Sequence, residues 1–190
     1  MKTGILGGTF DPPHFGHIKL GQNAKKLCSL DRVLILPSAN PPHKKSAAES
    51  NHRLNLAKIV ADEYGFELCD IEYKKSTPSY TFETIRDLKE LYPHDKFYFI
   101  IGGDSMRDFE KWYRWQELIT MCAFIVGART EEEKKEIELI AEDKKNRCGA
   151  EVYVISADAF PVSSTDIRMG EDLDKIPPSV KEYIEKNSLY

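Results

Sequence analysis

The chain has 190 residues, of which 41% are hydrophobic and 31% charged, and these values predict one folded domain over residues 1–190. A net charge of −4 disfavours nucleic acid as a partner, and no apolar run approaches the about 20 residues that a membrane span needs. The N-terminal stretch is too short for a signal sequence, and the four cysteines form no CxxC pair. We therefore expect reduced, buried thiols in a cytoplasmic protein that is not bound to a membrane.

Six short apolar or β-branched segments predict buried parallel strands, because several of them lack the alternation of a half-exposed strand. These segments span residues 3–7, 32–37, 66–72, 97–103, 123–128 and 152–156. Strands and helices alternate along the chain, which predicts a Rossmann-like α/β fold: a doubly wound parallel sheet with helices on both faces. Ligands of such sheets bind beyond the carboxyl ends of the strands.

Apolar residues at helical spacing predict helices between these strands, over residues 20–28, 54–64 and 82–88. Gly65 and Pro93 predict where the second and third of these helices end. A mixed-charge run over 130–147 predicts a solvated helix, and two prolines at 177 and 178 predict the start of a last helix. Residues 38–50 form a long polar loop whose His43, Lys44 and Lys45 could close over phosphate groups.

The first strand leads directly into the sequence GGTFDPPHFGH, residues 7–17. Gly7 and Gly8 would let backbone and ligand approach closely, although the segment matches neither a GxGxxG fingerprint nor a Walker loop. His14 and His17 stand three residues apart at the expected start of a helix, where free backbone N–H groups attract phosphate. The alternatives are a plain helix start with partly exposed rings, and a zinc site for which further ligands are lacking nearby.

A second motif, VSSTDIR at residues 162–168, has the pattern of a capped helix start. Ser163 would cap a helix whose third residue is Asp166, and Ser164 and Thr165 could then offer donors to a triphosphate. Arg168 would lie one turn beyond Thr165 on the same face. The alternative is a structural cap followed by a surface arginine.

Aromatic residues recur at a spacing of three at Phe109, Trp112 and Trp115, which is also the pattern of a core stripe, and we interpret Trp115 in that way. Thr81 and Asp104 each stand between a strand or loop and a helical segment. Both could therefore be ordinary helix caps as well as ligand contacts.

Several of these segments together resemble a known family. GTFDPPHFGH resembles the (H/T)xGH signature of the nucleotidyltransferase superfamily, and the double glycine with PPHFGH resembles bacterial nicotinate mononucleotide adenylyltransferases. VSSTDIR is similar to the second signature of that superfamily, SSTxIR. Residues 38–44, 78–84, 102–105 and 111–115 resemble the other ligand-contacting segments of the family, in family order. The resemblance covers almost the whole chain.

The resemblance implies transfer of the adenylyl group of ATP to nicotinate mononucleotide, giving deamido-NAD and pyrophosphate. It implies catalytic roles for four residues, namely His14, His17, Lys44 and Arg168. It implies an ATP site formed by Gly8, Thr9, Phe10, His14, Gly16, His17, Asp104, Ser164, Thr165 and Arg168. The implied mononucleotide site comprises Gly7, Lys44, Tyr80, Thr81, Trp112 and Tyr113, with Trp112 stacked on the pyridine ring and Thr81 at the carboxylate.

Mg²⁺ is expected to bridge ATP oxygens, with most of its ligands from substrate and water, because the sequence shows no carboxylate cluster dedicated to a metal. A homo-oligomer is compatible with the sequence. Two alternatives stay open: transfer to another acceptor, such as phosphopantetheine, nicotinamide mononucleotide or an alcohol phosphate, and a nucleotide sensor without activity. The histidines, Lys44 and Arg168 argue against a sensor, because binding alone does not need contacts to a transition state.

Overall fold

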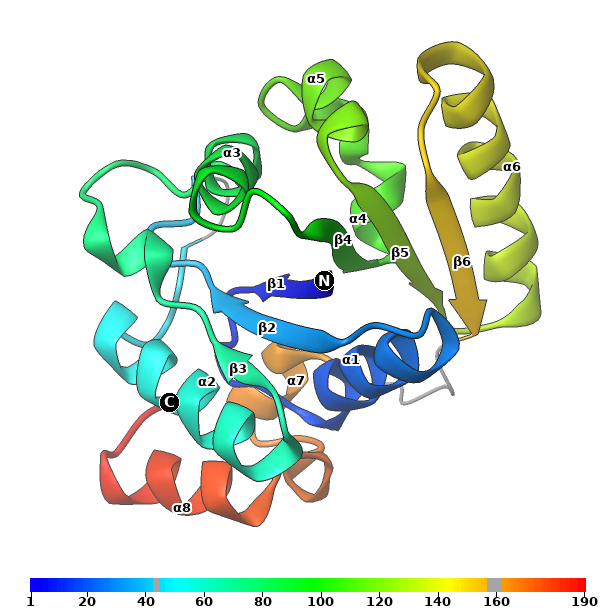
Figure 1. Cartoon of the computed structure of the whole chain (residues 1–190). Coiled ribbons are helices and arrows are strands. Elements are labelled where there is room, and N and C mark those ends of the chain that lie inside the picture. The colour runs from blue at the N-terminus through cyan, green and yellow to red at the C-terminus, as the bar shows by residue number, and fades with distance from the viewer. Residues whose placement is uncertain (43–44, 157–161) are drawn as a thin grey trace.

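The computed structural model describes residues 1–42, 45–156 and 162–190. Its strands form one six-stranded parallel sheet in the order β3-β2-β1-β4-β5-β6, which is the order of a Rossmann fold (Figure 1). The strands are β1 (Lys2–Gly8), β2 (Arg32–Pro37), β3 (Glu67–Leu68), β4 (Lys96–Gly102), β5 (Ala123–Ala128) and β6 (Val152–Ser156). The predicted doubly wound sheet is confirmed.

One strand is much shorter than the sequence indicates. The apolar segment 66–72 predicts a strand, but β3 has only 2 residues, and the 3-10 helix η1 (Ile71–Lys74) follows it. The chain turns away from the sheet because Glu72 is bound elsewhere: its buried carboxylate accepts hydrogen bonds from Thr84 Oγ1 at 2.7 Å and from the Ala39 amide at 3.4 Å.

Helices follow most of the strands and cover both faces of the sheet (Figure 1). The α-helices are α1 (Phe15–Leu27), α2 (Ser50–Tyr64), α3 (Thr81–Leu91), α4 (Gly103–Arg107), α5 (Trp115–Met121), α6 (Glu131–Cys148), α7 (Ser164–Arg168) and α8 (Pro178–Lys186). Two further 3-10 helices are η2 (Phe109–Lys111) and η3 (Leu173–Lys175). Gly65 ends α2 with φ 71°, a left-handed conformation that favours glycine, as its position after the apolar run predicts.

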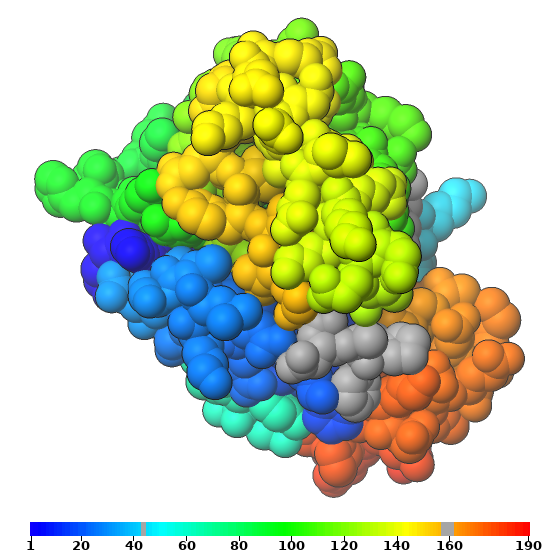
Figure 2. Space-filling view, turned by 90° about the vertical axis from the view of Figure 1, so that its right-hand side faces the viewer, coloured from blue at the N-terminus to red at the C-terminus, as the bar shows by residue number. Residues whose placement is uncertain are grey.

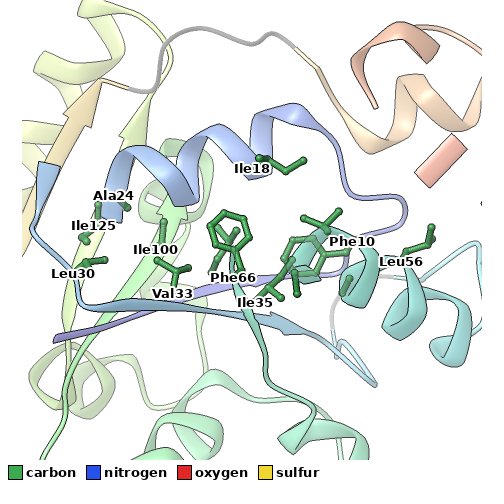
Figure 3. Close-up of a cluster of buried hydrophobic side chains, with 14 of the residues drawn as sticks. Phe10, Ile18, Ala24, Leu30, Val33, Ile35, Leu56, Phe66, Ile100 and Ile125 are labelled. Carbon is green, nitrogen blue, oxygen red and sulfur yellow. The ribbon is translucent and has the colours of Figure 1, made fainter. Parts of the chain in front are cut away.

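Successive residues of each strand point to opposite faces, so the sheet separates two cores. Leu6, Ile35 and Ile100 belong to the core beneath α1, α2 and α8, which Figure 3 shows with Phe10 and Ile18 among its members. Their neighbours Ile5 and Leu34 belong to the second core, against α3, α4, α5 and α6. Because both faces are covered, the strands are apolar almost throughout, and this is the pattern by which they are recognised.

The mixed-charge helix α6 lies on the surface, as predicted, and Figure 2 shows it in yellow-green on the face toward the viewer. Its buried residues are Ile137 and Lys144, whereas Leu139 is 69% exposed. All four cysteines are unpaired, but of these only Cys122 is buried, so the prediction of buried thiols holds for one residue of four. In the described part of the chain, no helix is both long and apolar enough to span a membrane.

The sheet is built outward from β1 in two directions: β2 and β3 lie on one side of it, and β4, β5 and β6 lie on the other. The chain therefore leaves β1 for α1 on one face of the sheet and leaves β4 for α4 on the other. These two connections diverge and open a crevice at the carboxyl ends of the strands, which is where doubly wound folds bind ligands.

Candidate active site

A cavity of about 500 Å³ opens at this crevice. Its size is that of a pocket for a small organic ligand. Its lining includes eight of the predicted site residues, Gly7, Gly8, Thr9, Tyr80, Thr81, Asp104, Trp112 and Tyr113. The structure therefore places residues from the end of β1, the start of α3, α4 and the loop before α5 around one space.

Gly7 and Gly8 line the cavity, but their small size also serves the core. A Cβ atom on Gly7 would lie 2.7 Å from Cζ of Phe99, and one on Gly8 would lie 3.1 Å from Cζ of Phe10. A side chain at Gly7 would thus displace an aromatic ring of the core. The absence of a side chain at these two positions therefore serves close packing within the protein as well as close approach of a ligand.

Aromatic side chains form one wall of the cavity. The rings of Tyr80 and Tyr113 lie 4.7 Å apart between centroids, and Trp112 packs edge-on against Phe99 at 6.2 Å and 89°. Trp112 lines the cavity, as the resemblance implies, while Trp115 packs against the core beneath it, which confirms the interpretation of Trp115. An aromatic wall of this kind suits a flat heteroaromatic ring.

The N-terminus of α3 lies at the same cavity. Thr81 is the first residue of this 11-residue helix, and the preceding Tyr80 makes no side-chain hydrogen bond to the helix end. The first amides of a helix have no partner within the helix and carry the positive end of its dipole. This end of α3 therefore offers neutral N–H donors and the Thr81 hydroxyl to an anionic group in the cavity.

Two of the carboxylates around the cavity, Asp104 and Asp108, are paired with cations, whereas Glu72 accepts hydrogen bonds from neutral groups. Asp104 lies 2.7 Å from Arg107 and 3.6 Å from Arg129, and Asp108 lies 2.6 Å from Lys111. Asp104 is not a helix cap, because α4 is capped by Gly102. Both oxygens of Asp104 face these cations, and each oxygen has a second lone pair that can accept a hydrogen bond from a ligand hydroxyl group.

His14 and His17 form a second group of site residues, at the start of α1. His14 is the residue before the helix, and the two rings stack with centroids 3.7 Å apart. Each Nδ1 accepts a hydrogen bond from the backbone amide of the other histidine, at 3.4 Å and 3.3 Å. The prediction that both rings point the same way is confirmed. The expectation of free amides is wrong for these two groups, because the imidazoles themselves cap the helix.

This arrangement fixes which ring nitrogen carries a proton. An Nδ1 that accepts a hydrogen bond is unprotonated, so the hydrogen of each neutral ring lies on Nε2. Gly16 makes room for the pair, since a Cβ atom there would lie 3.0 Å from Nδ1 of His14. The sequence therefore holds two imidazoles in one defined orientation at the positive end of a 13-residue helix.

The second motif meets the first in space. Ser163 caps α7 by accepting the Asp166 amide, as predicted. Arg168 donates to the Asp11 carbonyl at 2.6 Å and to Thr165 Oγ1 at 3.1 Å. Ser164 donates its hydroxyl to the Pro12 carbonyl at 2.9 Å, so that hydroxyl is not available to a phosphate in this structure, contrary to expectation.

The structure does not place the side chain of Phe10 or of Lys44, two of the predicted site residues, in the cavity, for two different reasons. The side chain of Phe10 is 1% exposed in the core, edge-on to the His17 ring at 5.1 Å, so only its backbone can contact a ligand. Lys44, predicted in both the catalytic and the mononucleotide sets, lies outside the described residues, as does His43.

Arg53 is a residue that the sequence analysis missed. It is 2% exposed and donates hydrogen bonds to the carbonyls of Thr9, Ser38, Ala39 and Ala48. It thereby ties the end of β1 to the loop after β2. A signal was present, because Arg53 lies on the apolar face of α2 with Leu56, Ala57 and Val60.

The arrangement of the site defines a class of protein. A Rossmann-like sheet carries paired imidazoles on its first helix and an arginine from the far end of the chain beside the same loop, which is the layout of a nucleotidyltransferase. A family model described as cytidylyltransferase-like matches residues 5–170. The chain is a nucleotidyltransferase of this family.

Relatives that match over nearly their full length indicate which group of nucleotidyltransferases the chain belongs to. The chain is 37% identical to a probable nicotinate-nucleotide adenylyltransferase of Shewanella pealeana, over 100% of this chain and 96% of that one. It is 40% identical to one of Exiguobacterium sibiricum, over 100% and 99%. A solved structure of Plasmodium falciparum nicotinic acid mononucleotide adenylyltransferase complexed with NaAD matches with a TM-score of 0.82 and 25% identity, over 100% and 98%. The chain belongs to the nicotinate-nucleotide adenylyltransferases.

Proposed function

We propose that this enzyme transfers the adenylyl group of ATP to nicotinate mononucleotide, forming deamido-NAD and releasing pyrophosphate in NAD biosynthesis. One observation supports the acceptor most directly: the uncapped N-terminus of α3 lies at a cavity whose wall is aromatic. The pyridine ring stacks on Trp112, and the nicotinate carboxylate accepts hydrogen bonds from the Thr81 hydroxyl and nearby backbone amides, including that of Tyr113. Gly7 and Tyr80 complete this subsite.

The chemistry requires little more than placement and charge neutralisation. The mononucleotide phosphate is already ionised at neutral pH, so no general base is needed to create the nucleophile. Its oxygen attacks the α-phosphorus of ATP, a new P–O bond forms, and the bond to pyrophosphate breaks. Negative charge develops on the α-phosphate and the leaving group, and preorganised donors there lower the barrier.

We assign these donors to four residues. His17 contacts the α-phosphate through Nε2, His14 lies beside it, and Arg168 with Lys44 binds the remaining phosphate charge. The orientation of the imidazoles supports the first two assignments, because their Nδ1 atoms are engaged by backbone amides. Lys44 is assigned from the sequence motif alone.

We assign the rest of the ATP site mainly to the two motifs at residues 7–17 and 162–168. The backbones of Gly8, Thr9, Phe10 and Gly16 approach the nucleotide closely. Thr165 and the backbone of Ser164 face the triphosphate, while the Ser164 hydroxyl stays bound to the Pro12 carbonyl. Asp104, held between Arg107 and Arg129, accepts a hydrogen bond from a ribose hydroxyl.

We propose that Mg²⁺ enters as part of the ATP complex. Among the residues the structure describes, no three His, Cys, Asp or Glu side chains group together as a metal site. The residues therefore fit an ion that is held by phosphate oxygens and water. Homo-oligomerisation and a cytoplasmic location stay predictions.

An assay of pyrophosphate release tests the proposed function. ATP and Mg²⁺ are offered with nicotinate mononucleotide, nicotinamide mononucleotide and phosphopantetheine in separate reactions. We expect release with nicotinate mononucleotide at the highest kcat/KM. Release only with phosphopantetheine would overturn the acceptor, and release with none of the three would favour a sensor.

Replacing Arg168 with alanine is expected to weaken ATP binding by about tenfold or more while nicotinate mononucleotide affinity stays nearly unchanged, because a charge-assisted hydrogen bond is lost. Thr165→Val should have a smaller effect in the same direction. Separate titrations of the two substrates measure this. Arg147→Ala is the control, since Arg147 makes only surface ion pairs with Glu110 and Asp143 among the described residues. Loss of mononucleotide affinity with ATP affinity intact would reverse the two subsites.

A further inference from the structure

Asp11, within the first motif, has a buried carboxylate. The residue is 3% exposed, and its side-chain oxygens accept three hydrogen bonds: from the Ala47 amide at 2.6 Å, the Ala48 amide at 3.1 Å and the Tyr190 hydroxyl at 2.6 Å. A buried carboxylate is costly unless such donors surround it. All three donors are neutral groups, namely two backbone amides and one phenol hydroxyl.

These bonds join segments that are far apart in the sequence. Ala47 and Ala48 belong to the loop before α2, while Tyr190 follows α8, and Figure 1 shows that end of the chain beside α2. The backbone carbonyl of Asp11 also accepts the hydrogen bond of Arg168. One residue between β1 and the histidine pair thus connects the three other parts of the chain that meet here.

Two of the connected segments carry proposed phosphate contacts. Arg168 is one of these contacts, and Lys44 precedes Ala47 by three residues in the sequence. The Asp11 carboxylate therefore fixes the position of residues 47–48 relative to the histidine motif. A misplacement of about 1 Å at a reacting centre can cost about 100-fold in rate.

We propose that Asp11 and Tyr190 are positioning residues: the carboxylate, with the hydroxyl donating to it, holds the loop at Ala47 and Ala48 against the motif that carries His14 and His17. Neither group touches the reacting atoms. The kinetic part of this inference rests on the proposed function, whereas the structural part does not.

The chemistry of the bonds supports a dedicated role. Two adjacent amides bind the two oxygens of one carboxylate, and asparagine would offer one acceptor and place an NH₂ group against a donor. Burial and the adjacent carboxylate raise the pKa of Tyr190, so its hydroxyl stays protonated and donates throughout the neutral range.

Two variants test the proposal, Asp11→Asn and Tyr190→Phe, with Tyr183→Phe as the matched control. Tyr183 lies in α8, and its hydroxyl, like that of Tyr190, makes hydrogen bonds to a distant part of the chain. Its partners are His52 and Asn55 of α2 rather than Asp11. The first readout is hydrogen exchange at the amides of Ala47 and Ala48. We expect protection to fall about tenfold or more in Asp11→Asn, less in Tyr190→Phe, and not in the control.

The second readout is steady-state kinetics with both substrates. We expect Asp11→Asn to lower kcat about tenfold, with the KM for nicotinate mononucleotide changed less than threefold, and Tyr190→Phe to act in the same direction. Wild-type exchange at both amides in Tyr190→Phe and Asp11→Asn would overturn the proposal, as would a kcat loss matched by Tyr183→Phe. If Asp11→Asn does not fold, Tyr190→Phe, which keeps its ring, decides both readouts. An inactive wild-type protein would refute the proposed function and leave the exchange test intact.

Discussion

Replacing His17 with alanine is expected to lower kcat by about 100-fold or more and to change the KM of either substrate only a few-fold. The reason is that the proposed contact of Nε2 with the α-phosphate strengthens as charge develops there, and interactions made mainly in the transition state act on kcat. Steady-state kinetics with each substrate varied in turn measure the two effects separately.

The control must separate chemistry from stability, because His17 also caps α1 through Nδ1. Loss of a helix cap costs about 1 kcal/mol, which lowers Tm but leaves the folded fraction near one at assay temperature. His52→Ala serves as the control for loss of an imidazole elsewhere, since His52 lies in α2 and bonds the Tyr183 hydroxyl. The Tm of each variant shows how much stability it loses. A His17→Ala enzyme with a lower Tm and a near wild-type kcat would show that the histidine is only structural.

Nicotinate mononucleotide is expected to have a kcat/KM about 100-fold above that of nicotinamide mononucleotide, with about tenfold as the lower bound. The two acceptors have nearly the same shape, so only the donors that meet the carboxylate can separate them. At the N-terminus of α3, the amide substrate would place its NH₂ group against a donor and leave that donor unpaired. An unpaired buried donor costs roughly 1 to 3 kcal/mol.

Trp112→Ala provides the internal control for this discrimination. In the proposed subsite the indole stacks on the ring and does not contact the substituent, so both acceptors should lose affinity alike and their ratio should stay the same. Thr81→Val should instead reduce the ratio. Equal kcat/KM values for the two acceptors in the wild-type enzyme would refute the carboxylate subsite.

The fold was predictable because its signals are local. The segments 32–37, 123–128 and 152–156 match their strands to the residue, since strands buried on both faces read as apolar runs between helical patterns. The segment 66–72 failed because apolar content alone does not reveal that Glu72 is bound by Thr84 and Ala39. That pairing is a tertiary contact without a local pattern.

In the site, too, the features that depend on local sequence were predictable and those that depend on tertiary contacts were not. The stacking of His14 on His17 follows from a spacing of three at a helix start, and the cap by Ser163 follows from its position before Asp166. The role of Asp11 could not be predicted, because its partners Ala48 and Tyr190 lie 37 and 179 residues away in the sequence. The engagement of Ser164 with Pro12 was hidden for the same reason, across 152 residues.

The proposed reaction is a single direct displacement at the α-phosphorus of ATP, with no covalent enzyme intermediate. The stereochemical course tests it: one diastereomer of ATP bearing a sulfur on the α-phosphorus is reacted with nicotinate mononucleotide, and the configuration of the thio-substituted dinucleotide product is determined. One in-line displacement inverts the configuration at phosphorus, so we expect inversion. Retention would require two displacements through an enzyme-bound adenylyl group and would contradict it.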